Sequence, residues 1–523
     1  MINWENLDTL ESYKKLLSLK QQVSLKQVLN ADRVKKYSVK CAAGLTYNYA
    51  AKQVNNQILK VMQELADEAQ LNEKFRALYE GETINTGENR KVLHHLLRGQ
   101  LGKDVVENKK NIRSFYKEQQ DRIAEFANNV HEGKITNKAG EKFTSVCQIG
   151  IGGSDLGPRA MYIALENLAK ANGTLKMDAH FISNVDPDDA AAVCKTLDLS
   201  HTLFILVSKS GTTQETLSNQ LFVKSFLEEA GLDAKNHMVA VTSETSPLAN
   251  NPDYLDSFYM DDYIGGRYSS CSAVGGTILS LAFGPKAFAD FLDGAHEADK
   301  LAKNKDIKKN PAMLDALIGL YERNVQGYPS TAILPYSQAL ARFPAHLQQA
   351  DMESNGKHVN RFGKAVNYAT GSVIFGEPGT NGQHSFYQLL HQGTDIIPLQ
   401  FIGFNENQNG KDITLEGSTN QKKLCANLVA QIVAFACGKN DENPNKTFEG
   451  ERPSSLIWGK KLTPASLGAL LAHFENKIMF QGFLWNLNSF DQEGVQLGKK
   501  LTKKVLAHDI DDALKEYSKI FDI

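Results

Sequence analysis

Residues 203–216 read Leu203-Phe204-Ile205-Leu206-Val207, then Ser208-Lys209-Ser210-Gly211-Thr212-Thr213-Gln214-Glu215-Thr216. The apolar run predicts a buried strand, and the residues after the glycine predict the start of a helix. A helix that begins after such a turn offers unpaired backbone N–H groups and a partial positive charge. The hydroxyl side chains add rotatable hydrogen-bond donors. The stretch therefore predicts a strand–turn–helix unit that binds a small phosphorylated molecule.

A simpler interpretation of the same turn is a polar helix cap. Thr212 and Glu215 have the spacing of a capping box, in which each side chain binds the other residue's backbone N–H. Against this, five hydroxyl side chains fall within the nine residues 208–216. That density, directly after a buried strand, favours phosphate binding over a cap.

Further short apolar runs flank this unit on both sides and alternate with stretches of helical periodicity. They lie at 143–149, 179–182, 238–242, 331–334, 372–375 and 396–402. Such alternation predicts βαβ units and parallel sheets. A glycine-marked strand-to-helix turn occurs in each half of the chain, which suggests two related α/β domains. Residues 1 to about 115 and the C-terminal stretch have helical periodicity instead.

The composition bounds the class of protein. A chain of 523 residues exceeds one ordinary hydrophobic core. Lys plus Arg number 58 and Asp plus Glu number 60, so the net charge gives no reason to expect a nucleic-acid partner. The six cysteines include no C-x-x-C pair, which argues against a zinc ribbon and suits a reducing compartment. With no signal peptide and no apolar run long enough to span a bilayer, we expect a cytoplasmic protein without membrane contact.

Four other segments could carry chemistry. The turn at 150–155 resembles a dinucleotide fingerprint but has Asp155 where the third glycine would stand. It could be a plain tight turn, or a ligand loop in which Gly153 and Ser154 meet the substrate. Arg267 follows two glycines, and Glu353 and His384 lie near turns. Each of these three could equally be an ordinary surface residue.

Taken together, the motifs resemble the glucose-6-phosphate isomerase family, also called phosphoglucose isomerases. The resemblance covers nearly the whole chain and keeps the family's motif order. It is carried by residues 150–158, 208–216, 265–269, 349–357, 382–384 and 490–499, with a further similarity at 92–94.

This resemblance implies an α/β fold with two sugar-isomerase (SIS) domains, each a three-layer α/β/α sandwich around a parallel sheet. Residues 116–285 would form the first domain and 286–510 the second. Residues 1–115 would be a helical segment packed on the large domain, and 511–523 a helical tail. The resemblance also implies a homodimer with active sites at the subunit interface, where His384 comes from the neighbouring subunit.

The implied activity is the reversible isomerisation of D-glucose 6-phosphate and D-fructose 6-phosphate through a cis-enediolate, in glycolysis and gluconeogenesis. Glu353 would carry the proton between C1 and C2, and Arg267 would stabilise the enediolate. Lys499 and His384 would assist ring opening. The expected substrate-binding residues are Gly153, Ser154, Ser208, Lys209, Ser210, Thr213, Thr216, Gln349 and Gln492. Neither a metal nor a cofactor is expected.

These expected residue roles agree with the chemistry of aldose–ketose exchange. One carboxylate can serve two adjacent carbons, a guanidinium lowers the barrier to an anionic intermediate, and a distant phosphate supplies binding energy. Residues Ser270-Cys271, Ala350, Glu493 and Gln496 depart from the commonest family pattern, none at an expected catalytic position. Two alternatives are a dual phosphoglucose/phosphomannose isomerase and a SIS-type sugar-phosphate sensor that binds without turnover.

Overall fold

The first sheet is five-stranded and parallel, in the order β6-β5-β7-β8-β9. The computed structural model describes residues 2–523. The strands are β5 (Ser145–Ile149), β6 (Asp178–Ile182), β7 (Thr202–Val207), β8 (Met238–Thr242) and β9 (Ser257–Tyr259). The apolar run that predicted a buried strand is therefore β7, at the centre of this sheet.

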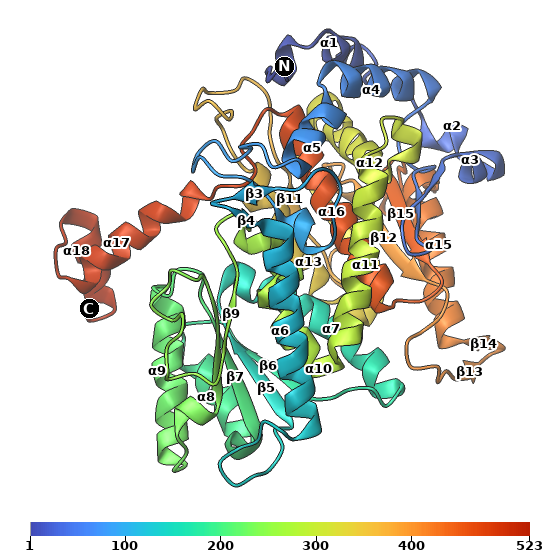
Figure 1. The fold of residues 1–523 in the computed structure, drawn as a ribbon. Helices are drawn as coiled ribbons and strands as arrows, with labels where there is room; N and C mark the ends of the chain where they lie inside the picture. The colour runs from blue at the N-terminus through green and yellow to red at the C-terminus, as the bar shows by residue number, and fades with distance from the viewer. Residues whose placement is uncertain (1) are drawn as a thin grey trace.

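Helices cover both faces of the first sheet, because successive side chains of each strand point to opposite sides. Phe204 and Leu206 of β7 belong to a core shared with α8 (Pro187–Thr196) and α9 (Gln214–Glu229). Leu203 and Ile205 face the main core, which contains α6 (Ile112–Glu132), α7 (Leu156–Ala171) and α10 (Ala273–Phe283). Figure 1 shows α8 and α9 on one side of the sheet and α6 and α10 on the other.

The second sheet has six strands in the order β1-β2-β15-β12-β10-β11. Four of them run parallel, namely β10 (Ser330–Tyr336), β11 (Val373–Phe375), β12 (Leu399–Phe404) and β15 (Ser454–Gly459). The remaining two are antiparallel and come from the N-terminal segment, β1 (Ser38–Lys40) and β2 (Thr46–Asn48). The predicted parallel sheet is thus extended by two strands of a segment expected to be helical.

Helices also cover both faces of the second sheet. One face packs against α14 (Tyr387–Gln392) and α15 (Asn420–Cys437), and the other lies in the main core. The main core also contains α11 (Pro285–Ala302), α12 (Pro311–Leu320) and α16 (Pro464–Leu484). Together with the first sheet, this confirms the predicted α/β class with two SIS-type sandwiches. The predicted domain boundaries stay a prediction.

The other elements lie outside the two sandwiches. The N-terminal helices are α1 (Glu11–Leu17), α2 (Leu25–Val28), α3 (Ala31–Lys36), α4 (Asn56–Glu68) and α5 (Leu71–Tyr79). Two small hairpins are β3 (Val106–Glu107) with β4 (Lys110–Asn111), and β13 (Thr414–Leu415) with β14 (Ser418–Thr419). The chain ends in α17 (Gln496–Leu506) and α18 (Asp512–Ile520), which project from the body in Figure 1.

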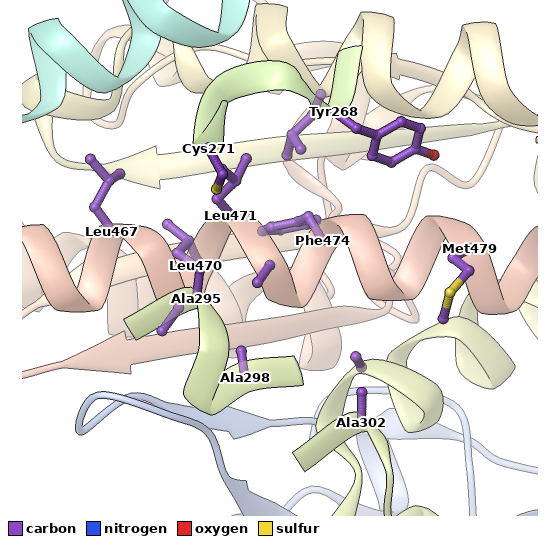
Figure 2. Packing of buried hydrophobic residues seen from close by; sticks show 14 of the residues in the cluster. Tyr268, Cys271, Ala295, Ala298, Ala302, Leu467, Leu470, Leu471, Phe474 and Met479 are labelled. Carbon is purple, nitrogen blue, oxygen red and sulfur yellow. The ribbon is translucent and has the colours of Figure 1, made fainter. Parts of the chain in front are cut away.

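Helix α16 runs through the centre of the molecule. Thr463 caps it in a capping box with Ser466, and Pro464 occupies the first turn. Helix α16 packs so closely on α11 that only glycine fits at position 294. A side chain there would lie 1.8 Å from the Ala465 carbonyl oxygen. Figure 2 shows Ala295 of α11 on one side of α16 and Cys271 on the other. Within residues 2–523, no helix is both long and apolar enough to cross a membrane.

Candidate active site

The predicted phosphate loop follows β7 and leads into α9. The capping-box interpretation is wrong, because the N-cap is Thr213 and no side chain caps the helix. Ser208 instead donates from Oγ to Thr213 Oγ1 at 3.1 Å, and the buried Oγ1 of Thr216 has no hydrogen-bond partner. The first turn of α9 therefore keeps its N–H groups and several hydroxyls free of the cap that would compete with an anion.

Two further residues of this loop, Ser210 and Lys209, already bind protein groups. Ser210 is exposed and accepts at Oγ from the backbone N–H of Thr212, 3.2 Å away. The Nζ of Lys209 lies 3.3 Å from the carbonyl oxygen of Ile264 and 3.7 Å from Asp262 Oδ1. Lys209 thus binds the segment that leads directly into Arg267, which connects the loop to the rest of the candidate site.

The glycine turn after β5 packs against Gly266, which precedes Arg267, and against the expected site residue Gln349. Gly153 lies so close to Gly266 that a side chain would come within 2.2 Å of its backbone. A side chain on Gly152 would lie 3.3 Å from Gln349 Nε2, and Gly152 has φ +60°. The turn 152–154 therefore joins the Arg267 segment to Gln349. The close packing at 153 and the positive φ at 152 account for both glycines, so they need not be explained by a bound dinucleotide.

Glu353 ends a π-helical turn, η10 (Gln348–Glu353), which continues α13 (Phe343–Leu347). Such turns are rare and often mark functional sites. The carboxylate is partly exposed, and its Oε1 lies 3.5 Å from Arg267 Nη1. A carboxylate that faces both solvent and a guanidinium can exchange a proton with a ligand.

Arg267 is buried and held on several sides. It lies in the 3₁₀ segment η6 (Gly266–Cys271) and is 2% exposed. Its guanidinium donates to the Ser354 hydroxyl at 2.7 Å and to the carbonyl oxygens of Ser489 and Asp491 at 2.6 and 3.0 Å. A weaker bond of 3.3 Å reaches Gln492 Oε1. The guanidinium is thus fixed in place before any ligand arrives.

An open cavity of about 1020 Å³ lies beside these groups. Its wall includes three expected site residues, Glu353, Gln349 and Gln492. The wall also includes Lys357, which the sequence contained within the Glu353 motif but to which no role was assigned. The phosphate loop 208–216 does not line this cavity.

Lys357 is an unusual lysine. Its Nζ donates to three backbone carbonyl oxygens, those of Glu353, Ser354 and Asp491, at 3.0, 2.8 and 3.2 Å. Burial, and then the nearby Arg267 charge, lower the pKa of Lys357 to about 8. Its spacing of four residues from Glu353 was the available signal, since residues four apart on a helix lie on one face.

His384 and Lys499 lie apart from the cavity wall. His384 is exposed at the end of η11 (Asn381–His384), and Lys499 is exposed in α17. The structure of the single chain therefore brings together Glu353, Arg267, Gln349 and Gln492, but neither His384 nor Lys499. One connection remains: Val495 lines the cavity, and Lys499 follows it by four residues, about 6 Å along a helix.

A model of the phosphoglucose isomerase family matches residues 48–520. The chain belongs to this family. It is 64% identical to the glucose-6-phosphate isomerase of Treponema denticola, over 99% of both chains. It is 50% identical to that of Borreliella burgdorferi, again over 99% of both chains.

A solved structure agrees with the family assignment. The crystal structure of a glucose-6-phosphate isomerase from Chlamydia trachomatis aligns with 99% of each chain, at a TM-score of 0.92 and 40% identity. The alignment covers nearly the full length of both proteins, so the two chains share the whole fold. The resemblance noted from the ordered motifs is thereby confirmed.

Proposed function

We propose that the chain interconverts glucose 6-phosphate and fructose 6-phosphate through a cis-enediolate, with Glu353 carrying the proton. The observation that carries this proposal is the pairing of Glu353 with Arg267. A partly exposed carboxylate lies 3.5 Å from a guanidinium that is itself fixed by four hydrogen bonds. Family membership supports the reaction class, and the relatives at 50–64% identity are named glucose-6-phosphate isomerases.

The geometry suits a single-base mechanism. Glu353 removes the proton from C2 of the open-chain aldose and returns it to C1, so one carboxylate serves both carbons. The electron pair of the broken C–H bond forms the C1=C2 double bond, and the carbonyl π pair moves onto O1 to create the anion. A proton then passes from the O2 hydroxyl to O1, so that C2 becomes the carbonyl carbon when C1 is protonated. Arg267 is the nearest fixed cation and stabilises this anion without reorganising, which lowers the barrier.

The phosphate is proposed to bind at the 208–216 loop. Ser208, Ser210, Thr213 and Thr216 supply hydroxyls, and the start of α9 supplies N–H groups and a partial positive charge. Lys209 is a weaker candidate, because its ammonium already binds the Ile264 carbonyl. Gly153, Ser154, Gln349 and Gln492 would then contact the sugar. Binding at the phosphate end positions C1 and C2 at Glu353.

We also propose a homodimer whose sites lie between subunits. His384 is exposed and could complete a partner's site, where it would donate the proton that opens the sugar ring. The C-terminal helices present uncovered apolar side chains, among them Leu497, Tyr517 and Phe521, which are 67%, 67% and 74% exposed. Packing of the C-terminal helices α17 and α18 against a partner subunit would also fix Lys499 at the mouth of the cavity, beside the ring oxygen of the bound sugar.

A coupled assay tests the reaction. Purified protein is supplied with fructose 6-phosphate, and glucose 6-phosphate is followed through its dehydrogenase. We expect turnover with an ordinary kcat of about 10² to 10³ per second. Binding of the substrate without turnover would support the sensor instead and contradict the proposal.

Mannose 6-phosphate in the same assay tests the dual isomerase, which the relatives' names do not favour. Efficient release of fructose 6-phosphate from it would support that alternative. The proposed cellular setting is the cytoplasm, in glycolysis and gluconeogenesis. Fractionation of cells with an antibody against the chain tests the setting independently of the activity.

A further inference from the structure

Lys357 differs from an ordinary cavity-lining lysine in where its ammonium lies. Its side chain is 16% exposed, and its Nζ is directed at backbone rather than at solvent. An ammonium has three N–H donors and no acceptor. Three carbonyl oxygens, from Glu353, Ser354 and Asp491, lie within hydrogen-bond distance of it. The donors that could bind a substrate are therefore already in use.

Two of those carbonyls belong to the end of the π-helical turn that carries Glu353. A carbonyl at a helix end has no intrahelical donor and needs another partner. Lys357 supplies that donor to both Glu353 and Ser354. The ammonium thereby fixes the backbone orientation at the residue whose carboxylate faces Arg267.

The third carbonyl belongs to the loop 488–492, which lies on the other side of the site. Lys357 binds Asp491 twice, at its backbone oxygen and through an ion pair of 3.2 Å with Oδ1. Arg267 also binds the Asp491 carbonyl oxygen, and it binds the hydroxyl of Ser354. Lys357 and Arg267 thus hold the same two residues from different directions.

We propose that Lys357 is a positioning residue for the isomerisation, which fixes the Glu353 backbone against the loop 488–492 and so sets the carboxylate relative to Arg267. The inference rests on the proposed role of Glu353 as the base. Lys357 acts through Glu353 and does not itself touch the sugar. It also couples the base to Gln492, which lies one residue beyond Asp491 in the same loop.

The surroundings of Lys357 give this role a pH dependence. The charged groups that face its ammonium are Arg267 of η6, Asp491 of the loop and Glu353 of η10. Burial and Arg267 lower the pKa of Lys357 to about 8, against the opposing effect of Asp491 and Glu353. The charged form therefore prevails below pH 8. Above it the neutral amine has one N–H donor fewer, and the positioning weakens.

The test replaces Lys357 with methionine, which keeps most of the length and removes the donors. We expect kcat to fall about 30- to 100-fold, because a small misplacement of a reacting group costs that much. KM should change less than about threefold, since the phosphate and sugar contacts remain. The decline of kcat above pH 8 should also disappear. Lys364→Met is the matched control, because Lys364 is exposed in the neighbouring segment and should behave as wild type.

Several outcomes would overturn the inference. The first is a kcat of Lys357→Met within about twofold of the wild-type value. The second is a Lys357→Met variant in which only KM changes and kcat does not. If Lys357→Met does not fold, the Lys357→Arg variant tests the positioning role instead. Its planar guanidinium cannot place three donors on the same carbonyls, so we expect about a tenfold lower kcat and no decline at pH 8. A fully active arginine variant, or failure of both variants to fold, would overturn the positioning role.

Wild type and Glu353→Gln are measured alongside. An inactive wild type would contradict the proposed function itself. An active Glu353→Gln would contradict the role of Glu353 as base and, with it, the positioning role of Lys357, while leaving the isomerase activity itself intact. Neither result can be confused with a failure that is confined to Lys357.

Discussion

The two groups of proposed catalytic residues differ in how firmly the chain holds them. Glu353 and Arg267 lie 3.5 Å apart, and the hydrogen bonds that the guanidinium donates to Ser354, Ser489 and Asp491 fix it in place. His384 and Lys499 are exposed, and the helix that bears Lys499 projects from the body (Figure 1). The proton-transfer centre is therefore preorganised within one chain, whereas the ring-opening residues are not.

This difference suggests a division of labour. Proton transfer between C1 and C2 passes through an anion and depends on fixed charges. Ring opening needs only a proton donor at the ring oxygen and an acceptor for the proton of the C1 hydroxyl, which a neighbouring subunit can supply in part. Isomerisation of an open-chain sugar should accordingly depend on the fold of one chain, and ring opening on assembly. The following variants probe the two groups separately.

The largest effect is expected for Glu353→Gln. The amide keeps the size of the side chain and cannot accept the proton, so kcat should fall about 10³- to 10⁴-fold. KM should stay close to the wild-type value, because the phosphate loop is untouched. Steady-state assays measure both constants, and calorimetric titration with the substrate checks that binding persists. Glu377→Gln, an exposed carboxylate near His384, serves as control. Retained activity in Glu353→Gln would remove it as the base.

A somewhat smaller effect is expected for Arg267→Lys. The ammonium keeps the charge but cannot reach Ser354, Ser489 and Asp491 at once, so kcat should fall about 10²- to 10³-fold. The melting temperature should also fall, because buried carbonyls lose their donors. Arg122→Lys, which alters a pair with Asp256 away from the site, is the control. A variant that loses stability but keeps kcat would reduce Arg267 to a structural role.

His384→Ala tests the second group. Loss of a proton donor in ring opening should lower kcat about 10²-fold or less. When His384→Ala and Glu353→Gln proteins are mixed under conditions of subunit exchange, hybrid dimers should contain one site with both residues intact. With random exchange at equal amounts, half of the dimers are hybrids with one intact site in two, so activity should recover to about a quarter of the wild-type level. No recovery, with exchange confirmed by mass spectrometry, would argue against a site shared between subunits.

The smallest effect is expected for Thr213→Ala in the phosphate loop. Loss of one hydrogen bond to a charged group should raise KM about tenfold and leave kcat nearly unchanged. An N-cap threonine ordinarily stabilises its helix, but Thr213 makes no cap bond. Only the 3.1 Å bond that its Oγ1 accepts from Ser208 is lost, so the melting temperature should fall only slightly. Asn55→Ala is the opposite case, because Asn55 caps α4 by accepting from the Ile58 N–H. It should lower the melting temperature without changing KM. The reverse pattern would mean that Thr213 serves as a cap.

The parallel strands were predictable because they are buried on both faces and read as short, largely apolar runs. Strands β5, β7, β8 and β12 are examples, and each lies within three residues of its predicted bounds. β2 and β15 escaped prediction although they lie inside the second sheet. β2 has three residues, and β15 mixes two serines with a half-exposed Trp458, so neither has a clear period.

The sequence named candidate site residues, whose roles stay predictions, but it did not predict the contacts between them. The motifs named Glu353 and Arg267, yet their closeness depends on packing between distant segments. The role of Lys357 was missed because one of its partners, the Asp491 carbonyl, lies 134 residues away and has no side-chain signal. The capping box failed for a similar reason, since spacing cannot tell which residue begins the helix.

The insertion of β2 between β1 and β15 has a consequence for how the protein is made. All strands of the first sheet come from residues 145–259, so they can pair before the C-terminal half of the chain has been synthesised. The second sheet pairs Asn48 with Leu456, so its N-terminal strands must wait for a segment synthesised roughly 400 residues later. At about 5 to 20 residues per second, that wait is about 20 to 80 s. During this time an unpaired hairpin is exposed to chaperones and to other nascent chains.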